Sequence, residues 1–186
     1  QPLFDGATLS GWRGNGALYR VEDGAITGEI AAGTALDHNE WLFWDGEVAD
    51  FELTLEYRIT GGPSANSGIQ IRCQRRQDGT ADGLQADLDD GTTWLGRLYD
   101  EHGRALLMER GTHVSISPDG RRWADEFAPA PSFASIPKKD AWNTYRIRAT
   151  GPRVAVWING VFFGSLVDHD AKAAEWAGRL AFQLHS

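Results

Sequence analysis

The stretch FELTLEYRI, residues 51–59, decides the fold class of this chain. Apolar and polar side chains alternate through it, and a period of two residues is the signature of a β-strand with one buried face. A helix would repeat its apolar residues every three to four positions. We therefore predict a strand here, with Phe51, Leu53 and Leu55 facing a core and Glu56 facing away from it.

The same alternation recurs in short runs further along the chain. It predicts strands at 69–73, 83–90, 145–148 and 180–185. Turn residues separate such runs at three places, which are Asp23-Gly24, Pro118-Asp119-Gly120 and Asn159-Gly160. These combinations are typical of hairpin turns. Many short strands with turn signals between them predict an all-β sandwich of two antiparallel sheets.

The length of 186 residues suits a single domain, and no internal repeat or low-complexity tract divides it. We predict one domain over 1–186. The proline-containing segment 111–141 is expected to be a long excursion with one hairpin. The segment 168–177 is expected to form one helical turn or a short helix. Because the chain ends directly after a predicted strand, a trimmed C-terminus is a further expectation.

The net charge of -8, from 18 basic and 26 acidic residues, argues against a nucleic-acid partner and against binding to anionic membranes. No apolar run approaches the ~18 residues of a membrane-spanning helix, and no secretion signal is recognisable. The single cysteine, Cys73, rules out an internal disulfide. Its parity predicts a buried, inert position.

The alternation also assigns the polar side chains to faces. If the predicted strands share a sheet, one outer surface carries Glu56, Gln70, Arg72, Gln85, Asp87, Tyr99, Gln183 and His185. Amides, carboxylates and guanidinium groups match sugar hydroxyls, which donate and accept hydrogen bonds together. Trp94 would stack on the apolar face of a sugar ring. The plainer interpretation is an ordinary solvated sheet face, although glutamines and a histidine are less typical of one.

Several of these residues suit chemistry as well as binding. His185 is a candidate general base or metal ligand, although a lone histidine near a terminus is more often neither. Glu56 and Asp87 are candidates for the carboxylate pair of a glycosidase. Asp100 and Glu101 are adjacent on one strand, and we assign them to a turn or to salt bridges. The triplet Asn66-Ser67-Gly68 is most simply a tight turn entering a strand.

Several motifs together resemble those of one family, the 3-keto-disaccharide hydrolases. Its N-terminal signature resembles Leu3-Phe4-Asp5-Gly6 followed by Leu9-Ser10-Gly11-Trp12, and its central blocks resemble Glu56-Tyr57-Arg58, Asn66-Ser67-Gly68-Ile69 and Gly83-Leu84-Gln85-Ala86-Asp87. Gly96 to Glu101, Trp142-Asn143, Asn159-Gly160 and Gly178 to His185 continue the match. The resemblance covers nearly the whole chain, and the order and spacing of the motifs make it fairly specific.

This resemblance implies a jelly-roll sandwich of the concanavalin A-like lectin/glucanase type. It also implies a secreted or periplasmic bacterial protein that acts on oxidised glycosides. Two departures stand out. The family usually ends with a further strand carrying an Arg-Asn pair, which is absent here. Many members have Glu and Gln where this chain has Gln85 and Asp87, which leaves the acid-base assignment open.

The implied chemistry is removal of the proton at C2 beside a 3-keto group, followed by loss of the C1 substituent and addition of water. Our hypothesis makes His185 or Glu56 the base, Arg72 or one bound divalent cation the enolate stabiliser, and Asp87 or Tyr99 the helper of the leaving group. His185 with Glu56 or Asp87 would hold such a cation.

The substrate-binding residues are then Arg72, Gln70, Gln85, Tyr99, Trp94 and Gln183. The expected partner is an oligosaccharide or glycoside, and the sequence indicates no oligomeric state. Two alternatives remain, a two-carboxylate glycosidase and a non-catalytic carbohydrate-binding module.

Overall fold

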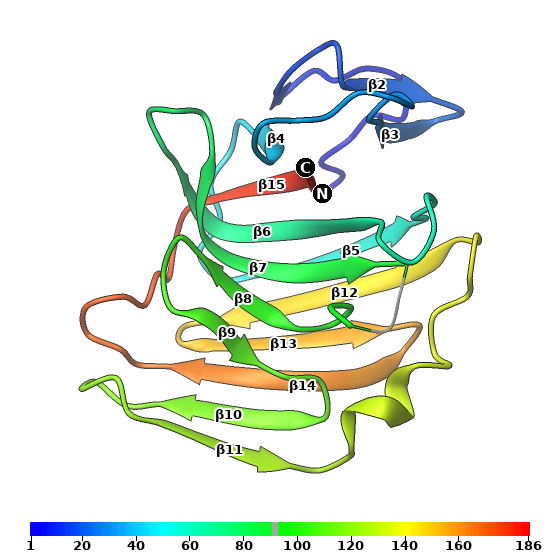
Figure 1. The fold of residues 1–186 in the computed structure, drawn as a ribbon. Coiled ribbons are helices and arrows are strands. Elements are labelled where there is room, and N and C mark those ends of the chain that lie inside the picture. The colour runs from blue at the N-terminus through cyan, green and yellow to red at the C-terminus, as the bar shows by residue number, and fades with distance from the viewer. Residues whose placement is uncertain (91–92) are drawn as a thin grey trace.

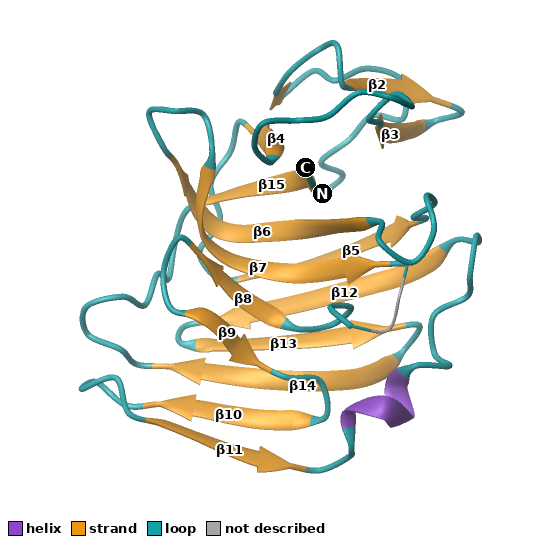
Figure 2. Cartoon of the chain, viewed as in Figure 1, coloured by secondary structure: helices purple, strands orange, loops and turns teal. Residues whose placement is uncertain are grey.

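The computed structural model describes residues 1–90 and 93–186 as a sandwich of two β-sheets, confirming the predicted fold class (Figures 1 and 2). The seven-stranded sheet, called the front sheet below, runs in the order β1 (Trp12–Arg13), β4 (Glu40–Trp44), β15 (Arg179–Leu184), β6 (Asn66–Arg75), β7 (Ala81–Asp89), β8 (Leu98–Glu101) and β9 (Ala105–Met108).

The six-stranded sheet, called the back sheet, runs in the order β11 (Arg122–Glu126), β10 (Thr112–Ile116), β14 (Val161–Asp168), β13 (Arg153–Ile158), β12 (Asn143–Thr150) and β5 (Phe51–Tyr57). β2 (Tyr19–Glu22) and β3 (Ala25–Gly28) form a separate hairpin, drawn at the top of Figure 1. A short 3-10 helix, η1, spans Ala130–Phe133. None of the described segments is a helix long and apolar enough to cross a bilayer.

The three predicted hairpin turns are confirmed, since β2–β3, β10–β11 and β13–β14 are antiparallel pairs around them. Asn159 and Gly160 have φ values of 50° and 79°, as a two-residue turn between twisted strands requires. Most other pairs are antiparallel too, but β10 and β14 run parallel. The segment 168–177 makes a single turn, in which the Ala174 N–H donates to the Asp170 carbonyl oxygen.

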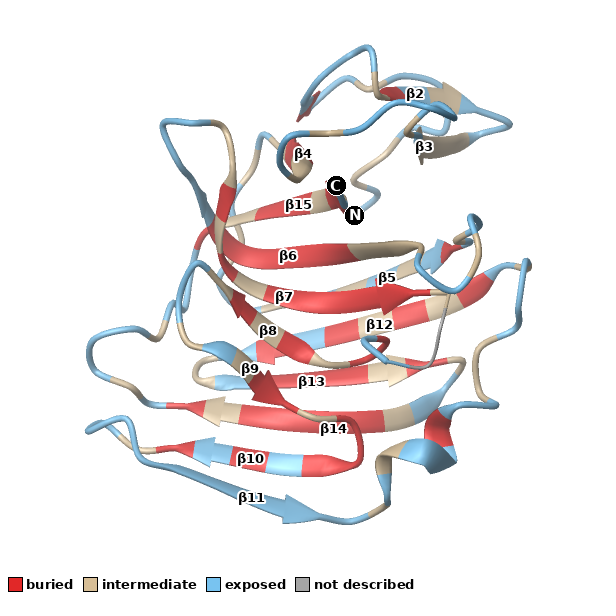
Figure 3. Ribbon diagram, viewed as in Figure 1, coloured by how far each residue is buried: buried red, intermediate tan, exposed pale blue. Residues whose placement is uncertain are grey.

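The apolar sides of the two sheets meet in one core. Ile69 and Ile71 from the front sheet pack with Ile147 and Phe163 from the back sheet, and all four side chains are buried. Leu53, one of the predicted core residues, packs against this cluster. Figure 3 shows the same pattern, with buried residues along β6 and β7 and an exposed edge strand, β11. The core leaves each sheet one outer face, and the candidate site lies on that of the front sheet.

Candidate functional site

Strand register determines which side chains share the outer face of the front sheet, called the front face below. Cα partners in successive strand pairs form one row across it, namely Arg13, Phe43, Ala181, Gln70, Gln85 and Tyr99. Residues directly opposite each other in neighbouring strands lie on the same face. Trp41, Gln183, Asp87 and Glu101 lie two residues from members of this row along their own strands and therefore share the face.

The polar side chains of the front face are unusually well buried for an outer surface. Gln70, Gln85, Asp87 and Gln183 are between 0% and 4% exposed. Large polar residues are rarely this buried unless they are paired. Their burial sets them apart from a plain solvated sheet face, which was the simpler interpretation of the sequence.

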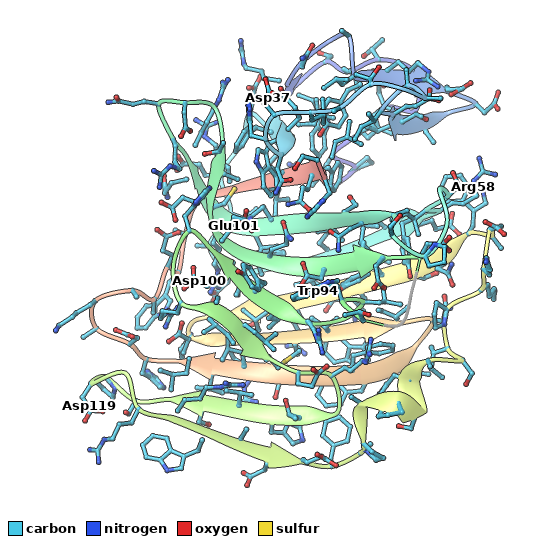
Figure 4. The ribbon with its side chains drawn as sticks, in the orientation of Figure 1. Asp37, Arg58, Trp94, Asp100, Glu101 and Asp119 are labelled. Carbon is cyan, nitrogen blue, oxygen red and sulfur yellow. The ribbon has the colours of Figure 1, made fainter. Side chains whose placement is uncertain are left out.

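An interaction between the two sides of the front face accompanies this enclosure. Asn39, just before β4, lies close enough to Glu101, at the end of β8, to lower the pKa of its carboxyl group. Three strands, β15, β6 and β7, separate β4 from β8 within the sheet. The segment before β4 therefore reaches across the face. Figure 4 labels Glu101 and also Asp37, which belongs to that segment.

Within the face, hydrogen bonds connect three side chains into a line that ends on a carboxylate. Gln70 Nε2 donates to Gln85 Oε1 at 3.4 Å, and Gln85 Nε2 donates to Asp87 Oδ1 at 2.7 Å. Gly68 makes room for this line, because a Cβ there would lie 2.2 Å from Gln85 Cδ. The Asn66-Ser67-Gly68 triplet is thus part of β6 and not the tight turn expected from the sequence.

Four buried polar atoms of this face have no hydrogen-bond partner among the described residues. They are Trp41 Nε1, Gln70 Oε1, Asp87 Oδ2 and Gln183 Oε1. Buried polar atoms in folded proteins normally have partners, so such atoms gathered on one face mark a place for a polar ligand. The set has one donor and three acceptors, which suits a ligand rich in hydroxyl groups.

Burial changes the acid-base behaviour of Asp87. Loss of solvent raises its pKa from 3.8 to about 7, while the bond from Gln85 opposes that rise. Burial likewise raises the pKa of Glu101, whose charge adds to the rise at Asp87. A carboxyl group that titrates near neutrality suits proton transfer to or from a bound molecule.

Trp94 lies in the connection between β7 and β8, and a buried carboxylate holds this connection in place. Asp89, 6% exposed, accepts the backbone N–H groups of Thr93, Trp94 and Leu95 at 2.7 to 3.1 Å. The Trp94 ring meets that of Tyr99 edge-on, with centroids 6.0 Å apart. Trp94 is 36% exposed and is labelled near the centre of Figure 4.

Replacing the Asp89 carboxylate should loosen this connection. An amide at position 89 would turn its NH2 group toward backbone N–H donors, so we expect Asp89→Asn to lower the free energy of unfolding by about 2 kcal/mol. Affinity for a sugar that stacks on Trp94 should fall with it. Urea denaturation and sugar titration measure the two effects. Asp78→Asn is the matched control, because Asp78 makes similar bonds to Thr80 on an exposed turn. Equal effects of the two substitutions on stability and on sugar affinity would contradict the role assigned to Asp89.

The expectation that Arg72 lies on the same face is wrong. The β6–β7 register shifts between Ile71 and Gln74, and Arg72 has a φ of 52°, so a β-bulge reverses the alternation at this point. The Arg72 guanidinium instead donates to the carbonyl oxygens of Ala49 at 2.8 Å and Gly151 at 2.7 Å. It therefore ties the front sheet to the turns that flank β5 and β12, and burial lowers its pKa.

The same bulge places Cys73 on the opposite side from the one its parity indicated. Cys73 is buried as expected, but it packs with Trp41, Phe43, Ala81 and Ala181 and not with the core between the sheets. Burial raises the pKa of its thiol to about 12, which agrees with an inert side chain.

Glu56 also lies away from the front face. It points outward as predicted, but β5 belongs to the back sheet, so the body of the sandwich separates Glu56 from Asp87. Packed sheets are about 10 Å apart, and the two side chains point in opposite directions. These carboxylates cannot flank one sugar as a glycosidase pair, and Glu56 cannot join His185 around one cation.

His185 follows β15, is exposed, and has Nδ1 2.9 Å from the carbonyl oxygen of Ser186. Its charge lowers the pKa of Glu101, so the two groups lie near each other. Throughout the described chain, no three His, Cys, Asp or Glu side chains gather in the manner of a metal site.

Sequence reasoning missed two members of the face. Glu101 lies two residues beyond Tyr99 on β8, so parity alone was enough to place it. Trp41 stands in the run Trp41-Leu42-Phe43-Trp44, which is apolar throughout and gives no alternation to follow. Asp100, in contrast, makes the expected salt bridge, with Arg104 Nε at 2.7 Å.

Comparison with known proteins defines the class. The model of one family, described as the 3-keto-alpha-glucoside-1,2-lyase-like domain, matches residues 1–186, so the chain belongs to that family. Membership places it in a carbohydrate-active class. Comparison with the curated proteins gives no match.

Solved structures agree on the fold. A protein from Parabacteroides distasonis with the provisional name glycosyl hydrolase has a TM-score of 0.66 at 17% identity, over 100% of this chain and 91% of that one. Carbohydrate binding module CBM66 from Bacillus subtilis has a TM-score of 0.60 at 11% identity, over 94% of this chain and 88% of that one. The Bacillus licheniformis beta-glucanase has a TM-score of 0.54 at 8% identity, over 94% of this chain and 78% of that one. At these identities the likeness shows a shared jelly-roll sandwich and no more.

Proposed function

We propose that this protein cleaves 3-keto-glycosides by eliminating the substituent at C1 and then adding water. The observation that carries the proposal is the buried Asp87 carboxyl on the front face. One of its oxygens is bonded to Gln85, and the other has no partner among the residues that the structure describes. The family to which the chain belongs, and the enclosed polar face, support the same chemistry.

The reaction needs a base first. Ionised Asp87 takes the proton from C2, and the electrons of that C–H bond form the enolate of the 3-keto group. The Trp41 Nε1–H, which has no partner within residues 1–90 and 93–186, hydrogen-bonds the enolate oxygen where negative charge develops. Gln70 Oε1 and Gln183 Oε1 accept hydroxyl protons and orient the ring.

The enolate then collapses to an enone as the C1–O bond breaks, and the leaving oxygen takes a proton. Glu101 is our candidate for the acid, since it is the other carboxyl of this face whose pKa burial raises. Water adds at C1 and a proton returns to C2, which restores the 3-keto sugar. Net hydrolysis results, with no oxidant or reductant consumed.

Turnover of a 3-keto-glucoside beside its unoxidised parent tests this proposal, with and without EDTA. We expect only the keto compound to be cleaved, because only its C2 proton is acidic. In D2O, deuterium should enter C2 of the keto compound. Loss of activity in EDTA would add a divalent cation to the scheme. Equal cleavage of the parent would instead indicate a glycosidase, and saturable sugar binding without cleavage would indicate a binding module.

A further inference from the structure

A cavity of about 610 Å³ lies beside the front face and is rich in arginine. Arg13, Arg75 and Arg179 line it together with Phe43 and Gln74. Two acidic residues, Asp45 and Glu47, complete the lining. Three guanidinium groups around one cavity are unexpected in a chain with a net charge of -8.

Strand register connects this cavity to the candidate site. Arg13 and Phe43 are Cα partners, and Phe43 is the partner of Ala181, which is in turn the partner of Gln70. The cavity therefore opens on the same face as the polar side chains around Asp87. Neighbouring strands lie about 4.8 Å apart, so roughly 14 Å separates Arg13 from Gln70 along the row. A ligand of two linked sugar rings reaches from one to the other.

The three arginines differ in how far their charges are neutralised. Arg13 pairs with Asp45 at 2.6 Å. Arg179 donates to the backbone carbonyl oxygen of Asp45 at 3.2 Å, and the Arg75 guanidinium lies over the Phe43 ring, 5.4 Å from its centroid. Within the described chain, neither Arg75 nor Arg179 has a carboxylate within 4.0 Å.

Arginine forks fit carboxylate and sulfate oxygens by two parallel hydrogen bonds, so two such groups with no acidic partner in the described part of the chain suit an anion. The Phe43 ring restricts the Arg75 guanidinium before any ligand arrives. We infer that this cavity binds an anionic group, a uronate carboxylate or a sulfate ester, on the sugar next to the one that reacts. This inference rests on the proposed function for the reacting sugar, but the cavity is testable without turnover.

The test is a calorimetric titration of the whole chain with four probes, which are glucose, glucuronate, glucose 6-sulfate and inorganic sulfate. We expect at least one anionic sugar to bind about tenfold or more tightly than glucose, with an affinity that falls as salt is added. Arg75→Gln and Arg179→Gln should each remove most of that preference. Arg153→Gln, the same change at an exposed arginine that begins β13 on the back sheet, should leave it intact.

The outcomes separate the two sources of charge and the two proposals. Tighter glucuronate binding identifies a carboxylate ligand, and tighter glucose 6-sulfate binding a sulfate ligand. Equal affinity for glucose and both anionic sugars would overturn the inference, as would unchanged affinities in both cavity variants. Inorganic sulfate binding as tightly as the anionic sugars would also overturn it, by showing a general anion site. None of these results depends on cleavage of a 3-keto-glucoside.

Discussion

Asp87→Asn should reduce turnover of a 3-keto-glucoside by roughly 10²- to 10⁴-fold, the usual contribution of a positioned base. The amide keeps an oxygen for the bond from Gln85, which is 2.7 Å long in the wild type, so the local structure should survive. Only the ability to take a proton is lost. Steady-state kinetics of the purified variant measure this effect.

The pH profile gives the same prediction a second readout. Because burial raises the pKa of Asp87 to about 7, wild-type activity should rise with pH through that value as the carboxyl ionises. A bound substrate will shift the midpoint, and the rise should be absent from any residual activity of the variant. Glu56→Gln on the back sheet is the matched control, and we expect it to leave activity unchanged. Activity lost in Glu56→Gln and retained in Asp87→Asn would refute the scheme.

The stability of the wild type should fall as pH rises, whereas its activity should rise. The folded chain holds the Asp87 proton up to about pH 7, whereas the unfolded chain releases it near 3.8, so the wild type loses stability as pH rises between these values. At pH 8 the buried charge costs up to about 4 kcal/mol, and Asp87→Asn removes that cost. Denaturation at pH 5 and pH 8 tests this point. We expect the stability advantage of the variant over the wild type to be larger at pH 8 than at pH 5.

Arg72→Met should destabilise the protein strongly and leave the chemistry of the remaining folded molecules nearly intact. The Arg72 side chain is 2% exposed, and its guanidinium donates hydrogen bonds to two carbonyl oxygens, those of Ala49 and Gly151. Losing two charge-assisted hydrogen bonds should cost about 3 kcal/mol. For a chain of this length that lowers Tm by roughly 6 to 12 °C.

Scanning calorimetry and kcat/KM, both on the purified variant, separate this structural role from the catalytic one that the sequence indicated. Arg153→Met removes an exposed arginine from the back sheet and should change Tm by no more than a degree or two. A large loss of kcat/KM with an unchanged Tm would show that Arg72 acts on the substrate after all.

The fold class could be predicted from the sequence because its signals are local. Alternation at 51–59 reports which side of a strand is buried, and the observed β5, Phe51–Tyr57, follows it closely. The turn at Asn159-Gly160 is equally local, since two residues with positive φ suffice to reverse the chain. The faces of Gln70, Gln85, Asp87, Tyr99 and Gln183 were predictable for the same reason.

The errors arose where a local rule was applied to a question of long-range pairing. Parity gave Glu56 the correct orientation, but which sheet β5 joins depends on its pairing with β12, some ninety residues away in the sequence. The prediction misplaced Arg72 because one bulge inverts the alternation, and no residue from Ile69 to Cys73 indicates that bulge. The enclosure of the front face, including the approach of Asn39 to Glu101, likewise involves distant segments.

By itself, then, the sequence determined that this protein is a sandwich of short strands with a polar face and an acidic surface, because period, turn chemistry and composition need no knowledge of neighbours. Only the tertiary structure decided that Asp87 is buried beside Gln85 while Glu56 stands on the far sheet and Arg72 joins the two sheets. Burial and proximity depend on which strands pair, and the pKa of Asp87 follows from that burial.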